Sequence, residues 1–147
     1  MKNSDENKTM KQISCVIFVE PTAKGRPRST VIAGHVHTYT PKLTRVAEAD
    51  IKAAIRQEIM KAGSFDAGVP LRISTTFFRE RPKSLPKRAV YPVSKPDLDN
   101  YFKTLTDALE KYVYQNDSQI VSCITRKRYC LPGQVPRIEL KIMEEVE

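Results

Sequence analysis

Three carboxylates and one ammonium group lie close together along this chain and together offer the groups that a metal-dependent nuclease needs. Asp97, Asp99 and Asp117 supply the carboxylates, and Lys103 supplies the ammonium. Carboxylate oxygens suit Mg²⁺ or Mn²⁺, which usually keep coordination positions for water and substrate phosphate. Such an ion would polarise the phosphate and make hydroxide from a bound water, while Lys103 would neutralise charge building in the transition state. This set of residues predicts hydrolysis of a phosphodiester.

The spacing of Asp97 and Asp99 requires an extended backbone if both are to grip one ion. Two residues apart, side chains point the same way in a strand but about 200° apart on a helix. Pro96 disfavours helical conformation at Lys95 and helps hold the entry extended. We therefore expect the pair at the mouth of a helix that begins at Leu98, where helix N–H groups also favour anions.

Each of these residues also has a structural interpretation. Asp97 and Asp99 can be helix caps, Lys103 can pair with Asp99 or Asp107 on the helix surface, and Asp117 lies in turn-forming sequence. Taken singly, these structural roles are the commoner ones. Their joint occurrence around one helix favours a site.

The net charge favours a polyanionic partner, although small soluble domains often carry similar charge. Lys and Arg total 25 against 17 Asp and Glu, a balance of +8. Most of the basic residues that we expect to contact DNA phosphates lie in two loops broken by Gly or Pro. They are Lys24, Arg26, Arg28, Arg79, Arg81, Lys83, Lys87 and Arg88. Arg126, Lys127 and Arg128 are weaker candidates for phosphate contacts, because alternate residues of a strand must face opposite sides.

The hydrophobic pattern predicts the elements that position these groups. Strands are expected at 13–19, 36–40, 71–77, 120–129 and 138–143, with helices from Pro41 to Ala62 and over 98–113. Thr40 is the expected cap of the first helix, whose apolar stripe begins at Leu43, and Gly63 its stop. This order predicts an α/β (α+β) fold, a small mixed sheet with two main helices packed on it. We expect a flexible tail at 1–11 and one domain at 12–147.

The cysteines and the hydropathy exclude several classes of protein. Cys15, Cys123 and Cys130 are odd in number and form no CxxC pair, which argues against a disulfide framework and a structural zinc site. Cys15 and Cys123 fall in apolar runs, so both are expected to be buried thiols. No apolar run is long enough to span a membrane, and the start lacks a signal-peptide core, so we expect a cytoplasmic protein without membrane association.

The segment 95–121 resembles the RusA-type Holliday junction resolvases, endonucleases of phages and prophages that cut four-way DNA junctions. The similarity rests on KPDLDN at 95–100, Lys103, DAL at 107–109 and NDSQIV at 116–121, with Pro21 and KGRPR at 24–28 upstream. The resemblance implies a RusA-like domain, a homodimer, and Mg²⁺-dependent cleavage of branched DNA in recombination and repair. Paired symmetric nicks fit a two-fold protein with two equivalent sites.

Carried over by position, the resemblance assigns the site residues. It implies that Asp97, Asp99 and Asp117 are the metal-binding catalytic carboxylates and that Lys103 is their essential partner. Asn116 stands where some relatives have another Asp. Asp107 also matches, either to orient Lys103 or to contact the metal.

Three other interpretations compete with this one. A phosphatase would use Asp-x-Asp as nucleophile and acid, but needs a buried apolar strand before the first Asp, where this chain has Pro96. A zinc site through His35 and His37 lacks further Cys or His nearby. The strongest rival is a non-catalytic protein of the same fold that binds branched DNA.

Overall fold

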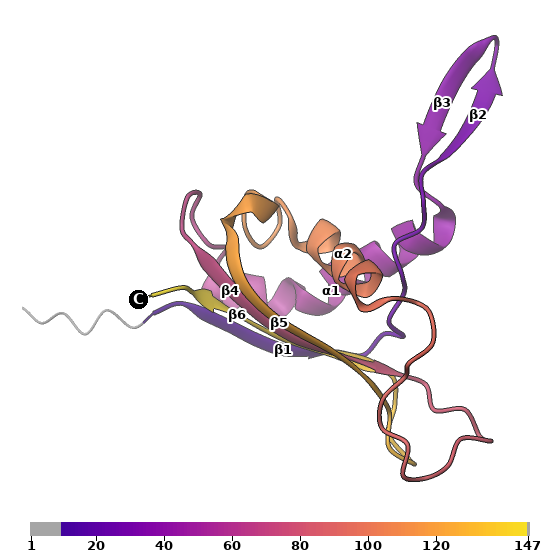
Figure 1. The fold of residues 1–147 in the computed structure, drawn as a ribbon. Coiled ribbons are helices and arrows are strands. Elements are labelled where there is room, and N and C mark those ends of the chain that lie inside the picture. The colour runs from indigo at the N-terminus through magenta and orange to yellow at the C-terminus, as the bar shows by residue number, and fades with distance from the viewer. Residues whose placement is uncertain (1–9, 147) are drawn as a thin grey trace, which may run out of the picture.

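The structure is a computed structural model that describes residues 10–146, and its body is a mixed sheet with two helices on one face (Figure 1). The sheet has the strand order β1 (Gln12–Ile17), β6 (Arg137–Glu144), β4 (Leu71–Arg79) and β5 (Ile120–Tyr129). Strands β4 and β5 are parallel, and the other neighbours are antiparallel. The predicted α+β class is therefore confirmed.

The helices α1 (Lys42–Ala62) and α2 (Leu98–Leu109) cover the same face of the sheet. Alternate residues of β4, among them Leu71, Ile73 and Phe77, are buried beneath them, as the predicted alternation requires. Helix α2 contributes Tyr101 and Leu105 to this core. Because β4 and β5 are parallel, the chain between them must cross over the sheet, and α2 is the helix of that crossover.

The ends of the elements differ from prediction where local geometry decides them. Helix α1 is capped by Pro41 rather than Thr40, and Leu43 is 78% exposed although it begins the predicted apolar stripe. Helix α2 stops at Leu109, short of the predicted 113, because Lys111 adopts φ 63° and turns the chain. Gly63, with φ 75°, ends α1 as predicted.

A strand that the sequence analysis missed pairs with the predicted second strand in an exposed hairpin. Strands β2 (Arg28–Ile32) and β3 (His35–Tyr39) form a two-stranded sheet that projects from the body (Figure 1). Its turn, Ala33-Gly34, has φ 49° and 81°, the signs that a two-residue hairpin turn requires. The β2 residues are all exposed, so no buried alternation marked them as a strand.

Three further predictions have outcomes here. Most of the predicted tail, residues 1–9, lies outside the described residues. Contrary to prediction, Cys123 is exposed and Cys15 is only half-buried, and Cys130 is the buried thiol; all three cysteines are free. In the part of the chain that the structure describes, no helix is both long and apolar enough to cross a membrane.

Candidate active site

A shallow cavity lies where α2 faces the start of β5, and three of the four predicted catalytic residues line it. Its volume is about 350 Å³. Helix α2 supplies acidic, basic and apolar side chains, and the short 3₁₀ helix η1 (Asp117–Gln119) closes one side. The lining residues are Asp99, Phe102, Lys103, Thr106, Asp117, Ile120 and Cys123.

Asp97, the fourth predicted residue, is the N-cap of α2 and is not among the lining residues. Its backbone is extended, with φ −68° and ψ 150°, as the sequence predicted for the mouth of this helix. Within residues 10–146 its side chain makes no capping hydrogen bond, so Asp97 occupies the cap position without capping the helix through its carboxylate. Asp99 follows in the first helical turn, so the extended Asp97–Asp99 pair that the sequence predicted is not formed; both carboxylates are exposed.

A capping box fixes Asp117 at the start of η1. The Asn116 side chain accepts a hydrogen bond from the Ser118 N–H at 2.8 Å, and Gln119 Oε1 accepts from the Asn116 N–H at 3.0 Å. Gln119 is 8% exposed, and its Nε2 donates to the Asp66 carbonyl at 2.9 Å. Asn116 therefore has a structural role that an aspartate at this position could also fill through its carboxylate.

The surroundings of Asp117 set its charge state. Tyr114 Oη lies 2.8 Å from Asp117 Oδ1, and Lys103 Nζ lies 4.0 Å from Asp117 Oδ2. Partial burial raises the pKa of Asp117, and the carboxylates of Glu110 and Asp107 raise it further, while Tyr114 and Lys103 act in the opposite direction. A cation beside this carboxylate would therefore be favoured.

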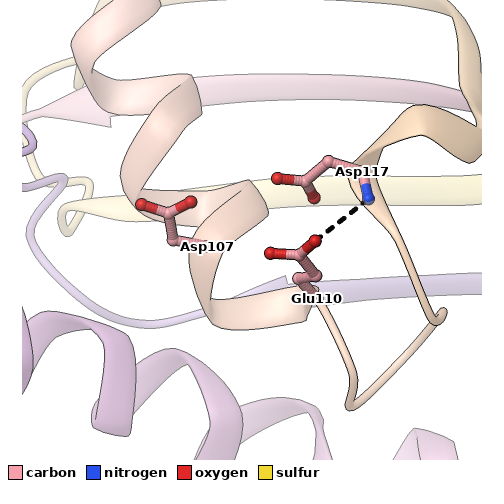
Figure 2. Close-up of side chains that lie close together, drawn as sticks. All are labelled: Asp107, Glu110 and Asp117. Atoms are coloured by element: carbon pink, nitrogen blue, oxygen red, sulfur yellow. Dashed lines mark hydrogen bonds between the residues drawn. The ribbon is translucent and has the colours of Figure 1, made fainter.

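Asp117 also belongs to a group of three carboxylates that the sequence analysis did not assemble. Ligand oxygens of Asp107, Glu110 and Asp117 all lie within 4.8 Å of one another (Figure 2). The Asp117 N–H also donates to Glu110 Oε1 at 3.4 Å. Glu110 follows Asp107 by three residues, about one helical turn. This spacing could have indicated from the sequence that the two carboxylates lie close together.

Among the described residues, no other trio of His, Cys, Asp or Glu ligand atoms is this close. Asp97 and Asp99 stand outside it, and so do His35 and His37 in the exposed hairpin. The metal set of Asp97, Asp99 and Asp117 stays a prediction. The oxygen donors themselves are of the kind that a hard divalent cation binds.

Lys103 forms an ion pair with Asp107, four residues further along the same helix. Lys103 Nζ lies 3.0 Å from Asp107 Oδ1, and Lys24 Nζ lies 2.9 Å from Asp107 Oδ2. Lys24 also pairs with Glu48 on α1 at 2.9 Å. The Lys24 ammonium, expected at a phosphate, is thus placed between two carboxylates.

The other basic residues divide into exposed and engaged groups. Arg79 stacks its guanidinium near the Tyr129 ring and contacts Ser94, and Arg81 donates to the carbonyls of Ala89 and Pro86. These two arginines shape the loop that follows β4. Of the basic residues that were predicted to contact DNA, the exposed ones are Arg26, Arg28, Lys83, Lys87 and Arg88.

Two basic residues of β5 support neighbouring segments. Lys127 Nζ donates to the carbonyls of Ser94 and Pro96, each at 3.0 Å, directly before α2. Arg128 lies over the Tyr91 ring, 5.6 Å from its centre. Both side chains thus contact the segment that leads into α2.

Comparison with known proteins identifies relatives of this chain. The sequence profile of the endodeoxyribonuclease RusA family matches residues 19–143, which include the cavity and the KGRPR segment. A crossover junction endodeoxyribonuclease, rusA, of Lactococcus phage r1t is 38% identical over 125 residues, covering 84% of this chain and 90% of that protein. The uncharacterized protein YqaN of Bacillus subtilis strain 168 is 32% identical over 139 residues, covering 90% and 96%. This chain belongs to the RusA endodeoxyribonuclease family.

Proposed function

We propose that this nuclease resolves four-way DNA junctions by paired symmetric nicks, as a Mg²⁺-dependent homodimer that acts in recombination and repair. The observation that carries the proposal is the cavity that Asp99, Lys103 and Asp117 share, within a family match over residues 19–143. The similarity to a phage protein described as a crossover junction endodeoxyribonuclease supports the junction as substrate. A two-fold dimer supplies one such site for each of two opposed strands.

The donor set of the site fits a hard divalent cation. The carboxylates of Asp107 and Glu110 lie near Asp117, where burial and neighbouring acids disfavour an uncompensated negative charge. Asp97, Asp99 and Asp117, the set that the family resemblance implies, are the proposed ligands, and Mn²⁺ is expected to substitute for Mg²⁺. When bound, the ion supplies Lewis acidity and an activated water.

The chain's own residues then have separable roles. Lys103, whose side chain is 56% exposed, can contact a phosphate oxygen and stabilise charge in the transition state. Phe102 and Ile120 form the apolar part of the cavity wall. The Tyr114 hydroxyl keeps Asp117 oriented toward the cavity through the 2.8 Å hydrogen bond.

Basic loops are proposed to hold the phosphate backbone. The exposed residues Arg26 and Arg28 on the hairpin side, and Lys83, Lys87 and Arg88 after β4, are the principal contacts. Arg79 and Arg81 are proposed as weaker contacts, because they also hold the loop. Neutralising several phosphates gives binding that weakens steeply with salt.

The test is cleavage of a synthetic four-way junction with Mg²⁺ and with EDTA, by wild type, Asp97→Asn and Asp117→Asn. Asp50→Asn makes the same change of charge on the exposed side of α1 and serves as the matched control. We expect symmetric nicks that need Mg²⁺ and are lost in the two site variants while junction binding persists. Tight junction binding by wild type without nicks in any divalent ion would instead support the non-catalytic rival.

A further inference from the structure

The backbone at Lys24 and Gly25 is fastened between the two helices. The Lys24 N–H donates to the Asn100 carbonyl of α2 at 3.0 Å, and the Gly25 N–H donates to Thr44 Oγ1 of α1 at 3.0 Å. A Cβ at Gly25 would lie 2.8 Å from Thr44 Oγ1 and 2.9 Å from Cγ of Pro41. Glycine therefore permits this close approach, which fixes where the Lys24 side chain begins.

From this fixed point the Lys24 side chain connects α1 to the site. Its ammonium lies 2.9 Å from Glu48 Oε1 and 2.9 Å from Asp107 Oδ2. The other oxygen of Asp107 lies 3.0 Å from Lys103 Nζ, which in turn lies 4.0 Å from Asp117. Alternating charges thus run from α1 through Lys24 and Asp107 to the cavity.

The charged side chains in this series differ in how far they are exposed. The Lys103 side chain is 56% exposed, whereas those of Asp107 and Lys24 are 19% and 22% exposed. An exposed pair four residues apart on a helix is weak alone, because two long side chains lose rotamer freedom to form it. A carboxylate already held by Lys24 removes part of that entropic cost.

The electrostatics of Asp107 agree with this arrangement. Burial alone raises the pKa of Asp107, but the ammonium groups of Lys24 and Lys103 outweigh it and hold that pKa below its usual value. Asp107 is thus ionised, with a separate cation at each oxygen. Both lysines have a raised pKa.

We propose that Lys24 is a positioning residue for the nuclease reaction: it locks Asp107 so that Asp107 holds the Lys103 ammonium beside Asp117. The proposal rests on the proposed function for the role of Lys103 in catalysis. Lys24 itself lies outside the residues that line the cavity. Its contribution is therefore to the rate of cleavage rather than to contact with DNA.

The first test measures the order of the Lys103 side chain directly, without reference to activity. Protein labelled at lysine is compared by NMR as wild type, Lys24→Met and Lys24→Arg, with exposed Lys52 of α1 as the reference in the same spectra. We expect the order parameter of the Lys103 side-chain terminus to fall to that of Lys52 in Lys24→Met and to recover in Lys24→Arg. An unchanged Lys103 in folded Lys24→Met overturns the proposal.

The second test follows single-turnover cleavage of a four-way junction and, separately, junction binding in Ca²⁺. Lys24→Met is expected to slow cleavage roughly tenfold or more, with a binding loss no larger than that of the charge-matched control Lys52→Met. In the Asp107→Asn background the same substitution should cost little further, because the connection is already cut. Equal losses in both backgrounds, or a loss confined to binding, overturn the proposal.

The two tests also separate this proposal from the proposed function. If wild type binds the junction without nicking it, junction resolution fails while the NMR comparison still decides whether Lys24 orders Lys103. If wild type nicks and Lys103 keeps its order in Lys24→Met, junction resolution stands and the role of Lys24 is rejected.

Discussion

Replacing Tyr114 with phenylalanine removes one hydroxyl from behind Asp117 and leaves a fully buried ring in place. Tyr114 Oη lies 2.8 Å from Asp117 Oδ1 and 3.3 Å from the Thr106 carbonyl. Burial raises the pKa of this hydroxyl, so it stays protonated and remains a donor. The Thr106 carbonyl already accepts the Glu110 N–H at 2.9 Å. The group that loses its partner is therefore the Asp117 carboxylate.

The size of the effect follows from the exposure of Asp117. A hydrogen bond to a charged group contributes about 1.5 to 3 kcal/mol, and the Asp117 side chain is 29% exposed, so water can replace part of it. We expect a loss of about 1 kcal/mol in the free energy of unfolding near neutral pH, or about 3 °C in Tm. The loss should shrink as pH falls through the pKa of folded Asp117, because the protonated carboxyl no longer needs a donor for its charge.

The same substitution should weaken metal binding and shift the acid side of the activity profile. Losing the Tyr114 hydrogen bond from the charged form raises the pKa of Asp117 further. Because an ion binds the carboxylate and not the acid, the acid-side midpoint of cleavage should move to higher pH, and a loss of about 1 kcal/mol should weaken Mn²⁺ binding roughly fivefold. Calorimetric titration with Mn²⁺ and rates across pH measure both effects.

Tyr112→Phe is the matched control for these measurements. Tyr112 is half-buried, and its hydroxyl makes no hydrogen bond to the residues that the structure describes. It should leave Mn²⁺ affinity and the acid-side midpoint unchanged. If Tyr114→Phe behaves in the same way, the Tyr114 hydroxyl does not stabilise the Asp117 carboxylate, and the reasoning above is refuted.

Three other predictions concern packing and thiols. Gly25→Ala should lower the free energy of unfolding by about 1 to 3 kcal/mol, since the new methyl meets buried Thr44 Oγ1 at 2.8 Å; an unchanged urea midpoint contradicts this. A bulky maleimide should attach to exposed Cys123, which lines the cavity, and block nicking by wild type but not by Cys123→Ser; labelled wild type that still nicks contradicts it. Burial and the Glu58 carboxylate raise the pKa of Cys15 to about 11, so about one thiol in a thousand is ionised at pH 8. Its alkylation, followed by mass spectrometry, should accelerate as pH rises toward 11, and a rate independent of pH would be inconsistent with that pKa.

The sequence predicted best those elements whose hydrophobic pattern reports burial. Strand β5 begins and ends at the expected residues, and β4 alternates as its sequence indicates. Strand β2 was missed whereas β3, which has no buried face either, was predicted; the turn between them is Ala33-Gly34 rather than the more typical Asn-Gly. Pattern analysis detects a strand through the core that it contacts, and this hairpin contacts none of the buried cluster.

Local spacing also predicted part of the site. Asp97 has the extended conformation expected before α2, and Asp99, Lys103 and Asp117 reach one cavity. The ion pair between Asp107 and Lys24 could not be predicted, because Lys24 lies on a segment far away in the sequence. No helical or strand periodicity relates those two residues. Only the packing of that segment between the helices brings them together.

The position of the cavity follows from the strand order. Strand β5 pairs with β4 and lies at the edge of the four-stranded sheet, and α2, the crossover between them, packs beside it. Asp117 must therefore return to the start of an edge strand, where the cavity opens beside α2 instead of between layers. A double-helical substrate is too wide for an enclosed pocket, so its backbone needs a site at such an edge. The parallel β4–β5 pair thus leaves the acidic residues of the proposed site accessible while the core stays closed beneath the helices.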